Sequence, residues 1–182
     1  MRAKSVVPVS FFLSIGSLAC FLSLFVFWGC NSTEKAVEKK VEQAQATRSA
    51  AMSTEGKQNL GLIASGARTY YSDEHVDRGG MEVKTGIFPP ARSWVCSAGG
   101  DEREKASVGS TNWKAEPWSS LRFELREHAF QYCYRASYDQ KSFAASAELG
   151  EQFFCVTGEA GPNGPNISAV RELPLDEDCE LP

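Results

Sequence analysis

An apolar run near the start of the chain constrains its fold and its location most. The run extends for 18 residues, from Phe11 to Trp28, without a charged side chain, and Arg2 and Lys4 precede it. A basic flank before such a run is typical of an export signal. We therefore expect the remainder of the chain to be membrane-tethered, with its globular part in the periplasm or at the cell surface.

Two interpretations of residues 1–30 stay open. As an uncleaved transmembrane helix, the run would extend about 27 Å, which is enough for a membrane anchor. As a cleaved signal peptide, it would end at Gly29 and leave Cys30 to be lipidated, as in bacterial lipoproteins, although Phe27 and Trp28 are bulky for such a site. Both interpretations make the membrane a partner of the protein.

The composition after this segment limits the classes of function. The 152 residues that follow Cys30 are enough for one domain with its own hydrophobic core. They contain 17 basic and 23 acidic residues, a net charge of −6, which argues against a nucleic-acid surface. No glycine pattern of a phosphate-binding loop occurs, so we expect neither nucleic acid nor a small-molecule cofactor as a partner.

Four cysteines lie in the part expected to be exported: Cys96, Cys133, Cys155 and Cys179. An even number in an oxidising compartment predicts two disulfides, and four cysteines allow three connectivities. The alternative is free thiols that pack as small hydrophobic side chains. No pair has the CxxC spacing, so neither a zinc site nor a redox site is indicated.

Two helical segments are predicted before the sheet. Residues 31–52 are charged and alanine-rich without a broad apolar stripe, which predicts an exposed helical stalk. Further on, Leu60, Ile63, Ala67 and Tyr70 recur at helical spacing and predict an amphipathic helix that ends near Ser72. This helix would begin a globular domain over residues 53–182.

The second half of the domain has the pattern of a sheet. Residues 74–115 contain many glycines and prolines and predict a long loop fastened by Cys96. Period-two alternation then predicts four strands, over residues 121–126, 128–135, 142–149 and 152–157, and a possible edge strand over 167–171. Short connections demand an antiparallel meander. The expected fold class is α+β, with a membrane-targeting helix and a stalk, then the amphipathic helix on a four-stranded sheet.

Several segments resemble the type IV pilin family, which includes pseudopilins and minor pilins. The first is residues 53–60, Ser-Thr-Glu-Gly-Lys-Gln-Asn-Leu, followed by Ile63 and the pair Tyr70-Tyr71. The others are Phe-Pro-Pro at 88–90, Trp-Ser-Ser-Leu-Arg-Phe at 118–123 and Phe-Gln-Tyr-Cys-Tyr at 130–134. Together they cover residues 53–157. The N-terminus differs from the family, because the motif of the prepilin peptidase is absent and no acidic residue precedes Glu34.

The resemblance implies a pilin-like αβ-roll, in which the helix lies across the sheet and the C-terminal cysteine pair closes a loop. It implies the pairings Cys155–Cys179 and Cys96–Cys133, with Cys133–Cys155 as the rival. Loops of this size would stabilise the domain by about 3 to 4 kcal/mol each.

Few residues suggest chemistry. His75 and His128 are the only histidines, and we expect both to be solvated because no nucleophile motif accompanies them. The acidic residues 176–178 lack the spacing of a calcium loop. Trp94, Trp113 and Trp118 are candidates for an interaction patch, although aromatic residues beside a small sheet also form its core and rim.

We therefore expect no catalytic residues and no metal site. The leading hypothesis is a non-enzymatic, pilin-like structural or interaction protein of the bacterial cell envelope, such as a minor subunit of a type IV pilus or a secretion apparatus. The alternative is an envelope lipoprotein that acts as a binding module.

Overall fold

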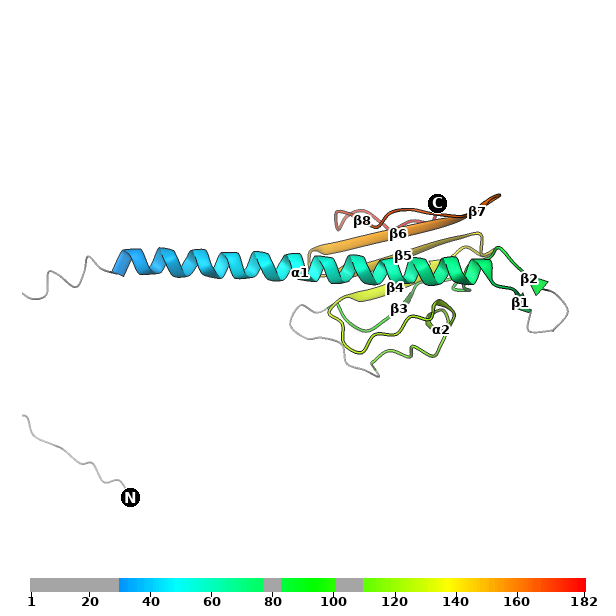
Figure 1. The fold of residues 1–182 in the computed structure, drawn as a ribbon, viewed down its shortest axis with the longest axis horizontal. Helices are drawn as coiled ribbons and strands as arrows, with labels where there is room; N and C mark the ends of the chain where they lie inside the picture. The colour runs from blue at the N-terminus through cyan, green and yellow to red at the C-terminus, as the bar shows by residue number, and fades with distance from the viewer. Residues whose placement is uncertain (1–29, 77–82, 101–109) are drawn as a thin grey trace, which may run out of the picture. The chain divides into compact units, whose positions relative to one another are not determined.

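The computed structural model describes residues 30–76, 83–100 and 110–182, with side chains from residue 37 (Figure 1). The contacts divide the chain into two compact units, and the boundary falls inside the first helix, between Ala46 and Thr47. The elements are α1 (Cys30–Ser72), β1 (His75–Val76), β2 (Val83–Lys84), β3 (Val95–Cys96), α2 (Trp118–Leu121), β4 (Gln131–Ala136), β5 (Ser142–Leu149), β6 (Gln152–Gly161), β7 (Gly164–Ile167) and β8 (Arg171–Glu172).

The expected membrane-targeting helix has no counterpart in the described part of the chain. The run from Phe11 to Trp28, to which the anchor and signal-peptide interpretations apply, lies outside the described residues. Among the described residues, no helix is both long enough and apolar enough to span a bilayer. Helix α1 has the length for a span, but its charged side chains exclude it.

Helix α1 joins the predicted stalk and the predicted amphipathic helix into one element of 43 residues. Its buried positions are Gly56, Leu60, Ile63 and Ala67, at the spacing of one helical face. Residues 37–50 are exposed throughout. The helix ends at Ser72, where the sequence predicted its end.

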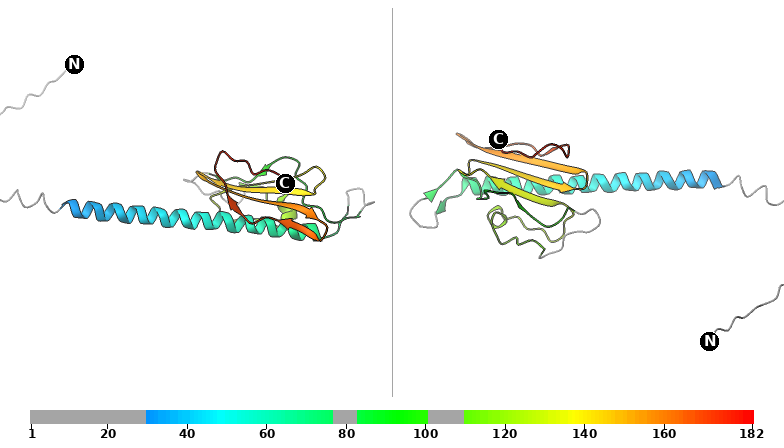
Figure 2. Two further views of the ribbon diagram at one scale, coloured as in Figure 1. Left: turned by 90° about the horizontal axis from the view of Figure 1, so that it is seen from above. Right: turned by 180° about the vertical axis from the view of Figure 1, so that it is seen from behind.

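The main sheet has six strands, so the expectation of four was wrong. The order is β3-β4-β5-β6-β7, with β8 also paired to β6, and every pairing is antiparallel (Figure 2). The extra strands come from β3, in the predicted long loop, and from the chain after β6. A separate two-stranded ribbon, β1 with β2, follows α1.

The strand predicted over residues 121–126 is absent. Leu121 ends the short helix α2, and Arg122 caps it in the left-handed conformation, with φ of 52°. Such a φ cannot continue an extended strand. Leu121 and Phe123 are buried, as the alternation suggested, but they reach the core from a helix end and an irregular segment. Strand β3 occupies the position beside β4 instead.

A β-bulge separates β7 from β8 on the same edge of the sheet. Gly158 pairs with Ile167, and Cys155 pairs with Arg171, so the outer chain has one residue more than β6. Ser168 holds the bulge, because its backbone N–H donates to the carbonyl of Thr157 and its Oγ accepts from the N–H of Thr157, at 2.9 and 3.0 Å.

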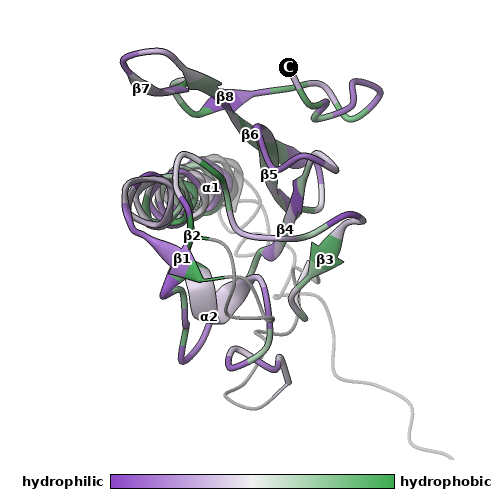
Figure 3. Cartoon of the chain, turned by 90° about the vertical axis from the view of Figure 1, so that its right-hand side faces the viewer, coloured by the Kyte–Doolittle hydropathy of each residue, from purple (hydrophilic) through white to green (hydrophobic). Residues whose placement is uncertain are grey.

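The core lies between the C-terminal half of α1 and one face of the sheet (Figure 3). Its largest fully buried side chains are aromatic or aliphatic and include Leu60, Ile63, Phe88, Phe130, Tyr132, Tyr134, Phe143 and Phe154. Two glycines of α1 permit the close approach. A Cβ on Gly66 would collide with the carbonyl oxygen of Leu121, and a Cβ on Gly56 would lie 3.0 Å from the rings of Phe130 and Phe154.

The C-terminal tail covers the opposite face of the sheet. Leu173 and Cys179 are buried there with Ala144 and Cys155. The disulfides are Cys96–Cys133 and Cys155–Cys179, the pairing that the resemblance implied.

The rival bridge, Cys133–Cys155, is excluded by the strand order. Ser146 of β5 pairs with Cys133 on one side and with Cys155 on the other, so the two cysteines are not on neighbouring strands. Two strand spacings amount to about 9.6 Å, beyond the Cα separation that a disulfide spans.

Candidate interaction surface

Both histidines contact other residues of the domain, and one of them corrects the expectation that both are solvated. His75 is half-buried, stacks on the ring of Tyr70 at 3.6 Å and donates its Nε2–H to the Tyr70 carbonyl at 2.6 Å. This bond satisfies a carbonyl in the last turn of α1. His128 was expected to be solvated, but it is fully buried, because Trp113 and the backbone of Ala98 pack against its ring.

His128 belongs to the core. Its Nε2 lies 2.8 Å from the carbonyl of Ala98, and a carbonyl only accepts, so Nε2 carries the proton. Its ring meets that of Trp113 edge to face, with centroids 5.4 Å apart. Its Nδ1 has no hydrogen-bond partner among the described residues. Its full burial and its ring contacts with Trp113 and Tyr132 indicate a packing role.

The described residues contain no group of three or more His, Cys, Asp or Glu side chains arranged to hold a metal ion. The acidic side chains of residues 176–178 are exposed. Cys96, Cys133, Cys155 and Cys179 all form the two disulfides.

The structure does not bring the three predicted patch tryptophans together at the surface. Trp113 and Trp118 are buried, with ring centroids 5.5 Å apart, and both contact Phe123. They therefore build the core beside α2. Trp94 differs, because it is 38% exposed and lies just before β3.

Trp94 belongs instead to a surface that we call the arginine–aromatic patch, made of Arg92, Trp94, Arg135 and Tyr138. The guanidinium of Arg135 lies 4.7 Å from the centroid of the Trp94 ring, and that of Arg92 lies 4.3 Å from the Tyr138 ring. Tyr138 is 78% exposed. Two stacked cation–aromatic pairs thus stand next to each other at one end of the sheet.

Backbone hydrogen bonds place these pairs side by side. The N–H of Ala136 donates to the carbonyl of Ala91 at 2.7 Å, and Val95 pairs with Tyr134. The segment that contains Arg92 and Trp94 therefore runs antiparallel to the end of β4. Because the partners are more than 40 positions apart in sequence, no local pattern could reveal Arg92, Arg135 and Tyr138 as one surface with Trp94.

The turn that carries Tyr138 is held by its own polar groups. The carboxylate of Asp139 accepts from the Ser137 hydroxyl at 2.6 Å and from the Lys141 N–H at 3.1 Å. These two bonds favour the ionised form and lower the pKa of Asp139. Lys141 Nζ in turn donates to the carbonyl of Gly86 at 2.9 Å. The turn is thus tied to the neighbouring loop.

This arrangement suits recognition of an anionic or polar partner. A guanidinium stacked on a ring is already oriented, so less side-chain entropy is lost on binding. Trp, Tyr and Arg are also the residues most enriched at energetic centres of protein interfaces. The patch is basic on a domain whose overall charge is acidic.

A second candidate surface lies on α1. Val37 and Val41 are exposed aliphatic side chains four residues apart, so they share one helical face. Charged residues surround them in the sequence.

Comparison with known proteins finds no matching family, no similar curated protein and no similar solved structure.

Proposed function

We propose that this chain is a non-enzymatic, pilin-like structural or interaction protein of the bacterial cell envelope, a minor subunit of a type IV pilus or a secretion apparatus. The observation that carries the proposal is the difference in burial between the two halves of α1. One continuous helix buries an apolar stripe in its second half and exposes every described side chain from residue 37 to 50.

The exposed part of α1 presents Val37 and Val41 to solvent. Aliphatic residues on one face of an exposed helix are well placed to pack against another helix. The sequence resemblance over residues 53–157 supports the same class of function. The two disulfides agree with an oxidising compartment, in which such proteins assemble.

The test is co-purification. Sheared surface fibres and solubilised envelope complexes are isolated from cells and probed for the full-length chain. The double variant Val37→Gln with Val41→Gln should remain folded and be depleted from these fractions at least about tenfold. The control, Lys39→Gln with Lys40→Gln, changes neighbouring exposed positions and should be retained. Wild-type protein found only as an unassociated membrane species would exclude the assembly role.

The arginine–aromatic patch supports the alternative, a membrane-tethered lipoprotein that acts as a binding module. In that case Cys30→Ala abolishes metabolic lipid labelling and changes the apparent mass. The double variant Trp94→Ala with Tyr138→Ala then loses capture of envelope partners after cross-linking. Loss of capture with normal lipidation separates the binding function from the tether.

A further inference from the structure

A groove runs between α1 and the sheet edge formed by β6, β7 and the bulge. It consists of two adjoining cavities, of about 240 and 510 Å³, and the side chain of Arg68 lines both. The first is lined by Gly61, Ala64, Ser65, Arg68, Val156, Ile167, Ser168 and Val170. The second lies between Arg68 and the hairpin turn, residues 161–166.

The chemistry of the groove changes along its length. Small residues on α1 keep the first cavity open, since a Cβ on Gly61 would meet no atom within 4 Å. Val156, Ile167 and Val170 make its opposite wall apolar. Arg68 is exposed, and no carboxylate of the described residues forms an ion pair with its guanidinium. The groove therefore suits an aliphatic side chain followed by a carboxylate.

The C-terminal tail of the same chain presents that pair of side chains. Leu175 is 56% exposed, and Asp176 beside it is exposed as well. Both lie at the centre of a turn that the N–H of Glu177 closes on the carbonyl of Pro174 at 3.1 Å. We call residues 174–178 the tail loop.

The tail loop is anchored at both of its ends. Leu173 before it and Cys179 after it are buried, and the disulfide to Cys155 fixes the second end. An exposed leucine on such a fixed loop is already oriented for contact, so little conformational entropy is lost when it binds.

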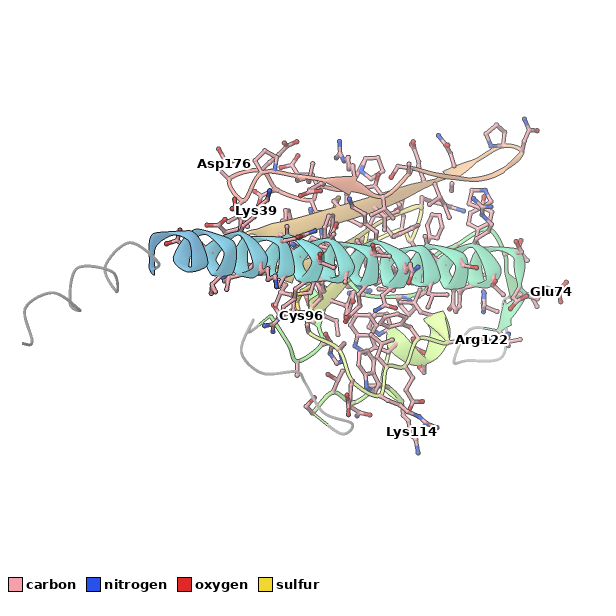
Figure 4. All side chains as sticks on the ribbon, turned by 60° about the vertical axis from the view of Figure 1, so that its left-hand side comes forward. Lys39, Glu74, Cys96, Lys114, Arg122 and Asp176 are labelled. Carbon is pink, nitrogen blue, oxygen red and sulfur yellow. A yellow bond between two sulfur atoms is a disulfide. The ribbon has the colours of Figure 1, made fainter. Side chains whose placement is uncertain are left out.

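The groove and the tail loop lie on different sides of the sheet, because Leu173 and Cys179, which flank the loop, are buried against Ala144 and Cys155 on the face opposite α1, whereas the groove adjoins α1. Just before the tail loop, the N–H of Leu173 donates a hydrogen bond to the carbonyl of Phe153, near the start of β6. At the same end of β6, the Gln152 side-chain amide donates to the hydroxyl of Ser49 on α1 at 2.9 Å. Ser49 and Arg68 are 19 positions apart, about 28 Å along a helix. Figure 4 labels Asp176 near one end of the sheet and Glu74 at the other. The loop, anchored at both ends, therefore lies away from Arg68 of its own chain.

We propose that the tail loop of one copy binds the groove of a second copy, with Leu175 in the apolar cavity and the Asp176 carboxylate paired with Arg68. This inference rests on the proposed structural function and names its partner as another copy of the chain. The contact joins two different surfaces, so it is heterologous. A bound pair leaves one groove and one loop free, which permits an open row of copies.

The test measures self-association of the full-length protein in detergent by sedimentation. Arg68→Glu and Asp176→Arg should each weaken association at least about tenfold, because each places like charges opposite one another. The double variant Arg68→Glu with Asp176→Arg restores the opposite charges and should recover it. Arg126→Glu changes an exposed arginine outside the groove and serves as the matched control. Leu175→Ser should weaken association as well.

Folding of every variant is checked by circular dichroism and by non-reducing electrophoresis. Association that is unchanged in Arg68→Glu and Asp176→Arg overturns the inference, and so does a folded double variant that fails to recover. The two proposals fail separately. A chain absent from envelope assemblies that still associates through these residues contradicts only the proposed function, whereas an assembled chain insensitive to both substitutions contradicts only the groove contact.

Discussion

The side-chain amide of Asn59 on α1 donates a hydrogen bond of 2.7 Å to the phenol oxygen of Tyr132 on β4. Tyr132 is fully buried, so this bond satisfies a polar atom inside the interface between helix and sheet. Burial raises the pKa of Tyr132, and the bond from Asn59 opposes that rise only in part. Burial also raises the pKa of Tyr134. The packed interface therefore requires neutral phenols.

Stability should fall in alkaline solution. Tyrosine in an unfolded chain ionises near pH 10, while Tyr132 and Tyr134 stay neutral in the folded domain to higher pH. Because the folded pKa is raised, the stabilisation is fully present below about pH 10 and is lost as the pH rises further. Urea unfolding at a series of pH values measures this loss. Tyr132→Phe should flatten it, whereas Tyr138→Phe, at an exposed site, should leave it unchanged.

Two glycines of α1 should respond to alanine in opposite directions. Gly66→Ala forces a methyl group onto the Leu121 carbonyl and should lower the free energy of unfolding by about 1 to 3 kcal/mol. Gly61→Ala adds a methyl group in open space, so the higher helix propensity of alanine should raise it by up to about 1 kcal/mol. Denaturant titration compares them. Equal effects at the two sites would contradict the close contact between α1 and α2.

Replacement of Trp118 should destabilise the domain far more than replacement of Trp94. Trp118→Ala empties a buried site in contact with Trp113 and should destabilise the domain by about 3 to 5 kcal/mol. Trp94→Ala loses only a surface contact with Arg135, worth about 1 kcal/mol or less. Thermal unfolding of the two variants checks this order. A large loss for Trp94 would mean that this residue supports the core.

The disulfide that fixes the tail should contribute strongly to stability. Cys155 and Cys179 are separated by 24 positions, and opening a loop of this size should lower the free energy of unfolding by about 3.5 kcal/mol. The double variant Cys155→Ala with Cys179→Ala is compared with wild type by urea unfolding. Mass spectrometry of an unreduced digest provides the control, since it should yield Cys96 linked to Cys133 in both proteins.

Local periodicity explains which elements the sequence predicted well. The stripe of Leu60, Ile63 and Ala67 is buried as expected, because spacings of three and four place these side chains on one helical face. Strand β5 spans the predicted residues, since Phe143 alternates with its neighbours and turns flank the segment. Alternation misled over residues 121–126, where burial follows the pattern but the left-handed Arg122 ends a helix.

The sequence by itself determined the helical stripe, the central strands, the acidic balance and the even set of cysteines, because these depend on neighbouring residues or on composition. Only the tertiary structure decided the six strands of the main sheet, the burial of His128, the stacking of Arg92 on Tyr138 and the groove beside Arg68. Each of these joins segments far apart in the chain. Their contacts depend on strand order and on the packing of α1, which no local period encodes.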